Sequence, residues 1–230
     1  MLRAREAIYP ERFTFHSARM RMQKVTPEEL KAMDGESLRC AVELADARVD
    51  VMGYACLVAI MSMGRGYHRQ SEVKLAKAAA QSGASIPIVT SAGALIDGLK
   101  ALGASRIAIV TPYMRPLTEL VVDYIEAEAI EVIDSLSLEI PDNLEVGERD
   151  PMELIKDVER LNVDGAEAVV LSACVQMPSL SAIPIVEDRL GLPVTSASVC
   201  TTRKLLEALQ LQPVVPGAGA LLSSDLDRGA

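Results

Sequence analysis

Two cysteines stand in the same kind of sequence context, Cys56 in DVMGYACLVAIM (50–61) and Cys174 in EAVVLSACVQMPSL (167–180). Each follows a short apolar run that predicts a buried strand. In open α/β sheets, ligands lie beyond the carboxyl ends of the strands. We therefore expect both thiols there, each just before a helix whose N-terminus favours a thiolate or holds a carboxylate. Two opposed thiols suit chemistry that needs a nucleophile or base on one side of a substrate and an acid on the other.

The alternative interpretation is that these cysteines are ordinary core residues, because free cysteine is among the most buried residue types. Core packing does not require a repeated context, so we favour a functional role for Cys56 and Cys174. Cys40 and Cys200 each lie in a helical pattern and do not follow a strand. We interpret these two as core residues.

The two histidines give weaker signals than the cysteines. His16 lies in RFTFHS (12–17), where we expect a strand and a partly buried imidazole. His68 lies in GRGYHRQ, which indicates an exposed loop or the start of a helix. Neither histidine is next to a cysteine in the sequence, so a Cys–His protease arrangement has no support from the residues.

Short apolar runs alternate with helical patterns along the chain. The runs are not alternately apolar and polar, which is typical of parallel strands covered on both faces. They occupy residues 49–55, 106–111 and 167–173, and we expect a further strand around 130–138. Apolar residues spaced by three and four predict a helix over 115–128. Strands that alternate with helices predict a doubly wound α/β fold with a parallel sheet.

An internal repeat suggests two halves of similar construction. Besides the two cysteine segments, IPIVTSAG (86–93) resembles LPVTSAS (192–198), and each is followed by a helical pattern. We therefore predict two Rossmann-like lobes related by a pseudo-twofold axis. The first lobe would comprise residues 1–93 plus 200–230, and the second lobe residues 94–199.

The same symmetry predicts that the first lobe lacks its N-terminal strand. The second lobe begins with the strand over 106–111, whereas the chain begins with MLRAREAI (1–8), which predicts a helix. Residues 12–17 would then form the strand that follows. Thr26 before Pro27 predicts a capped helix start, and Gly83 predicts a helix end.

The composition excludes several classes of partner. Half of the 230 residues are hydrophobic and the net charge is -9, which argues for a packed globular protein and against nucleic acid or an anionic membrane as a partner. The N-terminus lacks the apolar core of a signal peptide, and no apolar run is long enough to span a bilayer. The four cysteines show no metal-ligand spacing, so we expect free thiols in a reducing cytoplasm.

Several motifs together resemble the maleate cis–trans isomerases, which belong to the superfamily of aspartate/glutamate racemases and arylmalonate decarboxylase. They cover essentially the whole chain in the same order: FTFHSARMRM, GYACLVAIM, VTPYMRPL, PDNLEVG and LSACVQMPSL. The resemblance implies two Rossmann-like lobes that close over a small dicarboxylate, with neither metal nor organic cofactor. It also implies a homodimer.

The resemblance assigns roles to individual residues. Cys56 falls on the nucleophile that adds to the alkene carbon of maleate, giving a covalent succinyl-cysteine, and Cys174 falls on the opposing acid/base thiol. Tyr113 and Asn143 fall on donors to the substrate carboxylates. Three residues beside the cysteines would also line the substrate: Leu57, Val58 and Val175. The family normally opens with a strand ending in Pro-Ser-Ser-Asn, which this sequence lacks, so we expect weak activity or low stability from the chain as written.

Two other functions remain open at this stage. An amino-acid racemase of the same superfamily also needs two opposed cysteines, whereas arylmalonate decarboxylation characteristically uses one. A non-catalytic binding or redox-responsive α/β protein could carry the same thiols.

Overall fold

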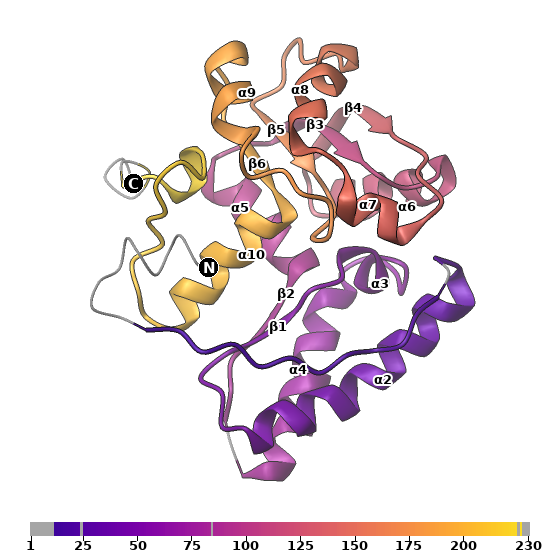
Figure 1. Cartoon of the computed structure of the whole chain (residues 1–230), viewed down its shortest axis with the longest axis vertical. Helices are drawn as coiled ribbons and strands as arrows, with labels where there is room; N and C mark the ends of the chain where they lie inside the picture. Colours follow the sequence, from indigo (N-terminus) through magenta and orange to yellow (C-terminus); the bar gives the residue numbers. More distant parts are fainter. Residues whose placement is uncertain (1–11, 24, 84, 225, 227–230) are drawn as a thin grey trace.

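The computed structural model describes residues 12–23, 25–83, 85–224 and 226. Its helices and strands alternate along the chain (Figure 1). In order they are α2 (Pro27–Asp46), β1 (Met52–Tyr54), α3 (Leu57–Met61), α4 (Tyr67–Ala79), β2 (Ile88–Thr90), α5 (Ser91–Ala101), β3 (Arg106–Thr111), α6 (Arg115–Glu126), β4 (Glu131–Ser137), α7 (Asn143–Glu148), α8 (Leu154–Asp157), β5 (Ala168–Ser172), α9 (Ile183–Leu190), β6 (Val194–Ser196) and α10 (Ala197–Ala208). Short 3-10 helices occupy Ala80–Ser82, Pro151–Glu153, Val158–Arg160 and Ala220–Leu222.

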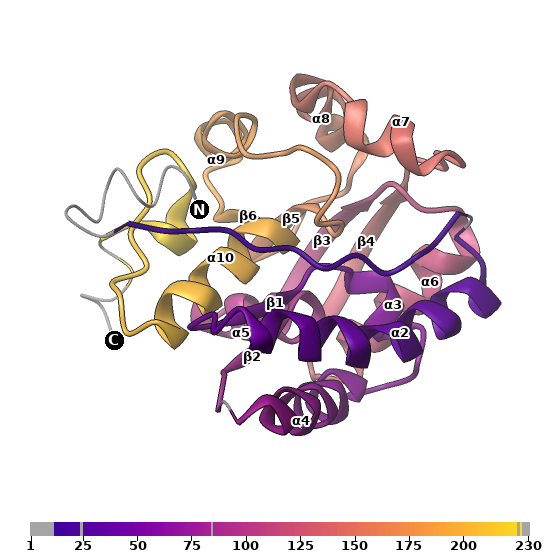
Figure 2. The same ribbon diagram turned by 60° about the horizontal axis from the view of Figure 1, so that its bottom comes forward.

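Two separate parallel sheets form the framework, which confirms the predicted α/β class. The first sheet pairs β1 with β2, and the second has the strand order β4-β3-β5-β6. Every described strand pair is parallel. The first sheet lies in the lower half of Figure 1, beside α2 and α4, and the second lies in the upper half. Figure 2 shows α2 and α4 on the same side of the molecule, where they pack against each other.

Helices α5 and α10 pack against each other between the two sheets (Figure 1). Each follows a strand and starts with a hydroxyl cap: the Thr90 side chain accepts from Gly93 N, and the Ser196 side chain accepts from Val199 N. Both predicted lobe boundaries, at 93/94 and 199/200, fall inside these helices. The lobe partition and the pseudo-twofold axis therefore stay predictions.

The core is thickest around the second sheet. Residues 107–110 of β3 and 168–171 of β5 have no exposed surface, which is typical of parallel strands that are paired on both edges and covered on both faces. The sequence predicted β3 to the residue, and α2 begins as predicted, with the Thr26 side chain accepting from Glu29 N. Gly83 ends a helical segment with a φ of 79°, a conformation that glycine adopts without strain. Cys40 and Cys200 are buried in helices, as predicted.

The prediction of a strand over residues 12–17 is wrong. These residues have no strand conformation, and His16 is exposed rather than partly buried. A strand needs a hydrogen-bonded neighbour. In the second sheet β4 pairs with the central strand β3, which in turn pairs with β5. The first sheet has no strand equivalent to β3 among the described residues, so residues 12–17 lack the neighbour with which they would pair. A cavity beside β1 is lined by Tyr54 of that strand and by Ala18 and Met20, which follow the segment 12–17. The helix predicted over residues 1–8 lies outside the described residues.

His68 begins a helix as predicted, but the prediction that it is exposed is wrong. It is the second residue of α4, and only 6% of its surface is exposed. Its Nδ1 lies 2.6 Å from the Tyr124 hydroxyl, which also accepts from the His68 backbone N–H at 3.0 Å. Burial lowers the pKa of His68, so the neutral imidazole is favoured. Its role in the described structure is to join α4 to α6.

Within the described residues, no helix combines the length and apolar character needed to cross a bilayer. Three or more His, Cys, Asp or Glu side chains arranged to hold a metal ion are likewise not found in that part of the chain.

Candidate active site

Cys56 lies at the junction of β1 and α3, where the sequence places it. It is the N-cap residue of α3, with extended backbone angles (φ -143°, ψ 96°), and its side chain is partly buried. The backbone N–H groups of Ala59 and Val58 lower the pKa of its thiol, as expected at a helix start. Burial outweighs them and raises the pKa of Cys56 to about 11. The backbone N–H groups at the helix start therefore favour the thiolate, as expected, but burial has the larger effect on the pKa of this thiol.

Cys174 follows β5 but does not precede a helix, contrary to the prediction. It lies in a loop that continues to α9 at Ile183, and it is 8% exposed. The Ser172 hydroxyl donates to the Cys174 carbonyl oxygen at 2.9 Å, and Ala173 N donates to Val110 O of β3 at 2.9 Å. These bonds fix the loop conformation in place of helical hydrogen bonds. The thiol thus lies beyond the carboxyl end of the strand, as expected from the sheet.

Tyr113 lies within electrostatic reach of both thiols. It follows β3, is 8% exposed, and its hydroxyl donates to the carbonyl oxygen of Ala173 at 3.2 Å. Burial is the largest cause that raises the pKa of Tyr113 well above its ordinary value, followed by the nearby thiols of Cys174 and Cys56. Cys174 in turn contributes to the raised pKa of Cys56. The carboxyl ends of β1, β3 and β5 therefore bring one phenol and two thiols into one electrostatic neighbourhood.

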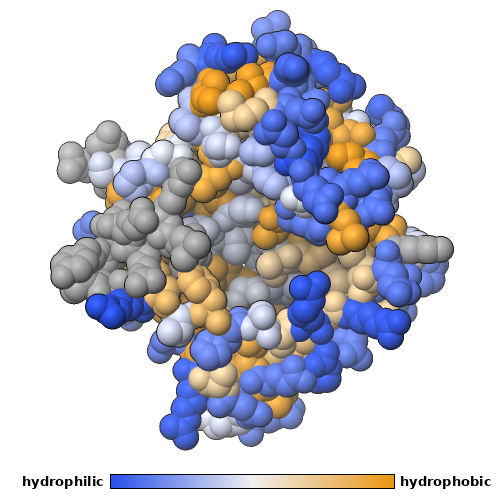
Figure 3. Space-filling model, in the orientation of Figure 1, coloured by the Kyte–Doolittle hydropathy of each residue, from blue (hydrophilic) through white to orange (hydrophobic). Residues whose placement is uncertain are grey.

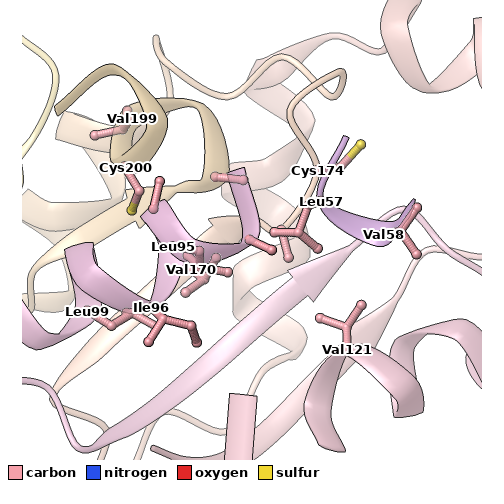
Figure 4. Packing of buried hydrophobic residues seen from close by; sticks show 14 of the residues in the cluster. Leu57, Val58, Leu95, Ile96, Leu99, Val121, Val170, Cys174, Val199 and Cys200 are labelled. Carbon is pink, nitrogen blue, oxygen red and sulfur yellow. The ribbon is translucent and has the colours of Figure 1, made fainter. Parts of the chain in front are cut away.

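Apolar residues surround this neighbourhood. Leu57 and Val58 begin α3 and are buried, and they belong with Cys174 to one cluster of buried residues, part of which Figure 4 draws. Val175 is half-buried, and its carbonyl oxygen accepts from the Ser198 hydroxyl at 3.1 Å. On the face drawn in Figure 3, a hollow bordered by hydrophobic residues lies between the two halves of the molecule.

Asn143 reaches the same region from α7, of which it is the first residue. Its backbone oxygen accepts from Gln176 Nε2 at 2.5 Å, so α7 is attached to the loop that carries Cys174. Gly147, one turn later, keeps this approach open, since a Cβ there would lie 3.2 Å from the same Nε2 atom. Gln176 could not be identified from the sequence, because an exposed glutamine gives no signal until its hydrogen-bond partner is known.

Comparisons with known proteins show the family to which the chain belongs. A family model described as arylmalonate decarboxylase matches residues 3–222. The chain belongs to the arylmalonate decarboxylase family. Within this family it is 62% identical over 224 residues to "Maleate isomerase" of Geobacillus stearothermophilus, covering 97% of this chain and 89% of that relative. It is 46% identical over 213 residues to "Maleate isomerase" of Nocardia farcinica, covering 93% and 85%.

Solved structures of the arylmalonate decarboxylase family have the same fold. A cysteine-to-alanine variant of the maleate isomerase Iso from Pseudomonas putida S16 with maleate has a TM-score of 0.94 at 62% identity, covering 96% of this chain and 89% of that one. A cysteine-to-serine variant of the Nocardia farcinica maleate cis-trans isomerase with a covalently bound succinylcysteine intermediate has a TM-score of 0.92 at 44% identity, covering 96% and 91%. The family and the fold predicted from the sequence are confirmed.

Proposed function

We propose that this protein isomerises maleate to fumarate through a covalent succinyl-cysteine on Cys56. The observation that carries the proposal is the placement of Cys56 and Cys174, from two different sheets, beside the same buried phenol of Tyr113. The similarity to maleate isomerases over nearly the whole chain supports it.

Isomerisation requires that the carbon–carbon double bond become single for a moment. Cys56 thiolate adds to one alkene carbon, and the electron pair of the double bond moves to the neighbouring carbon and its carboxylate. Donors near that carboxylate stabilise the charge; we assign this role to Tyr113 and the Asn143 side chain. The Cys174 thiol protonates the carbon, which gives a succinyl thioether on Cys56.

Rotation about the new single bond separates the two carboxylates and relieves their repulsion. Cys174 thiolate then removes the proton, the double bond re-forms, and the carbon–sulfur bond breaks to release fumarate and Cys56 thiolate. Leu57, Val58 and Val175 line the reacting carbons and limit the access of water. Because the Cys56 thiol has a pKa of about 11 without ligand, formation of the thiolate is a demanding step of the cycle.

The experiment that tests the proposal is proton NMR of maleate with the protein. We expect fumarate to accumulate, and we expect the mass of Cys56 to increase by that of a succinyl group in a Cys174→Ser variant. Normal turnover by Cys56→Ala would refute the role of this thiol. Exchange of the α-proton of aspartate in deuterated water, with no fumarate formed, would instead indicate a racemase.

Three further proposals accompany this function. We propose a homodimer, by similarity to the family, which light scattering can test. The four cysteines are free in the described structure, which supports a reducing cytoplasm as the compartment. We also propose the lobe partition predicted from the sequence, with residues 1–93 plus 200–230 in the first lobe.

A further inference from the structure

Tyr54 is a buried residue to which no role has so far been given. It ends β1, where Met52 and Tyr54 are buried and Gly53 between them is exposed. Because side chains alternate along a strand, Tyr54 and Cys56, two residues later, start out on the same face. Only 5% of the Tyr54 surface is exposed, and its hydroxyl has no hydrogen-bond partner within the described part of the chain.

An unpartnered buried hydroxyl is unusual, because most buried polar groups in proteins are hydrogen-bonded. A phenylalanine would supply nearly the same packing surface without a polar group to desolvate. The fold of β1 therefore gives no reason for a tyrosine at this position. A function of the hydroxyl does give one.

A second unpartnered polar atom lies on α2, which packs beside α3 and α4. Asp34 Oδ2 accepts from the Tyr67 hydroxyl at 2.6 Å, and that hydroxyl accepts from Lys74 Nζ at 3.1 Å. Asp34 Oδ1 is buried and has no partner among the described residues. A chain of polar groups thus runs inward from the exposed Lys74 and ends at a free acceptor. The Tyr54 hydroxyl is a free donor.

The electrostatics relate these groups to the candidate nucleophile. Burial raises the pKa of Tyr54 most, and the next largest cause is the thiol of Cys56, followed by Asp34 and Tyr67. The phenol therefore lies within electrostatic reach of both the Cys56 thiol and the Asp34 carboxylate. A single ordered water can satisfy such a set, since buried waters typically make about three hydrogen bonds.

We propose that Tyr54 is a positioning residue for the Cys56 thiolate. Its hydroxyl donates to a water molecule, and this water donates one hydrogen to the Cys56 sulfur and the other to Asp34 Oδ1. The hydrogen bond to sulfur offsets part of the loss of solvation that the buried thiolate suffers. The inference deepens the proposed function, because it rests on Cys56 as the nucleophile.

The decisive variant is Tyr54→Phe, which removes one hydroxyl and keeps the ring. We expect the rate of Cys56 alkylation by iodoacetamide at pH 8 to fall about three- to tenfold, a shift of about 0.5–1 unit in the thiol pKa. The kcat for maleate should fall by a similar factor. The melting temperature should stay the same or rise, because the variant removes an unpartnered polar atom. The other titratable groups that face the phenol or the thiol are unchanged: Asp34, Cys40 and Tyr67 near the phenol, and Tyr113 and Cys174 near the thiol.

Tyr124→Phe is the matched control, because its hydroxyl is bonded to His68 and does not reach the site. We expect this variant to melt at a lower temperature with an unchanged alkylation rate. The inference would be overturned if Cys56 were alkylated in Tyr54→Phe at the same rate as in the wild type. It would also be overturned if the variant lost activity only in proportion to a loss of folded protein. Alkylation does not require turnover, so an inactive wild type would refute the proposed function and leave this test intact.

Discussion

Gly98 holds α5 close to α10, and its replacement by alanine tests how tightly the two halves are joined. A Cβ at Gly98 would lie 2.6 Å from Cys200 Sγ, 3.1 Å from Cys200 Cβ and 3.1 Å from Leu221 Cδ2. Cys200 is fully buried, so its sulfur has no room to move. Overpacking a core costs about 1–3 kcal/mol, and we expect the upper end here. The gain in helix propensity from glycine to alanine is about 1 kcal/mol.

The net expectation for Gly98→Ala is a loss of about 2 kcal/mol of unfolding free energy, or about 4–8 °C in melting temperature. Urea denaturation followed by circular dichroism measures it. In a Cys200→Ala background the 2.6 Å contact with the sulfur is gone, and the two remaining contacts at 3.1 Å offset the gain in helix propensity, so adding Gly98→Ala should change stability by less than about 0.5 kcal/mol. Gly35→Ala in α2 is the control, because nothing lies within 4 Å of its Cβ, and it should stabilise by up to about 1 kcal/mol. An equal cost of Gly98→Ala in both backgrounds would refute the reasoning.

Three further outcomes follow from the site. Because the pKa of the Cys56 thiol is about 11, its alkylation by iodoacetamide should accelerate about tenfold per pH unit from pH 7 to 9; a plateau below pH 8 would contradict this. Burial raises the pKa values of Cys56 to about 11 and of Cys200 to about 12, from an ordinary value of 9.0. As the pH rises, the two thiols therefore lose their protons in the unfolded chain before they do so in the folded protein. The unfolding free energy should not depend on these thiols below about pH 9 and should fall above about pH 9. This fall should be less steep in Cys200→Ala, which has only one of the two thiols. Gln176→Leu removes the bond to the Asn143 oxygen and should raise KM for maleate a few-fold with little change in melting temperature, whereas Gln81→Leu, in an exposed 3-10 turn, should change neither.

Local sequence signals predicted the elements whose structure depends on local interactions. The run at 106–111 is a continuous apolar segment, and it forms the central strand β3 with the predicted bounds. Thr26 caps α2 through a bond to Glu29, three residues away, so the sequence contains both partners. The rule that ligands lie beyond the carboxyl ends of parallel strands predicted the position of Cys56 after β1 and of Cys174 after β5.

Features that depend on distant partners could not be predicted. His68 is buried because Tyr124, 56 positions later, bonds to it. The strand predicted over 12–17 has the right composition, but the described sheet offers it no neighbour. The bond from Gln176 to Asn143 and the unpartnered hydroxyl of Tyr54 depend on the folded arrangement. Neither has a recognisable motif.

The two sheets differ in a way that bears on how this enzyme family can be altered. Cys56 is attached to the smaller sheet, where β1 and β2 share only three residue pairs, whereas Cys174 belongs to the four-stranded one. The candidate nucleophile is therefore supported by a short sheet and by the helices packed around α3, namely α2, α4, α5 and α6. Leu30 and Met33, on the buried side of α2, are not among the residues proposed to contact the substrate. Directed evolution for faster or more durable catalysts should nonetheless find beneficial changes there, far from the chemistry.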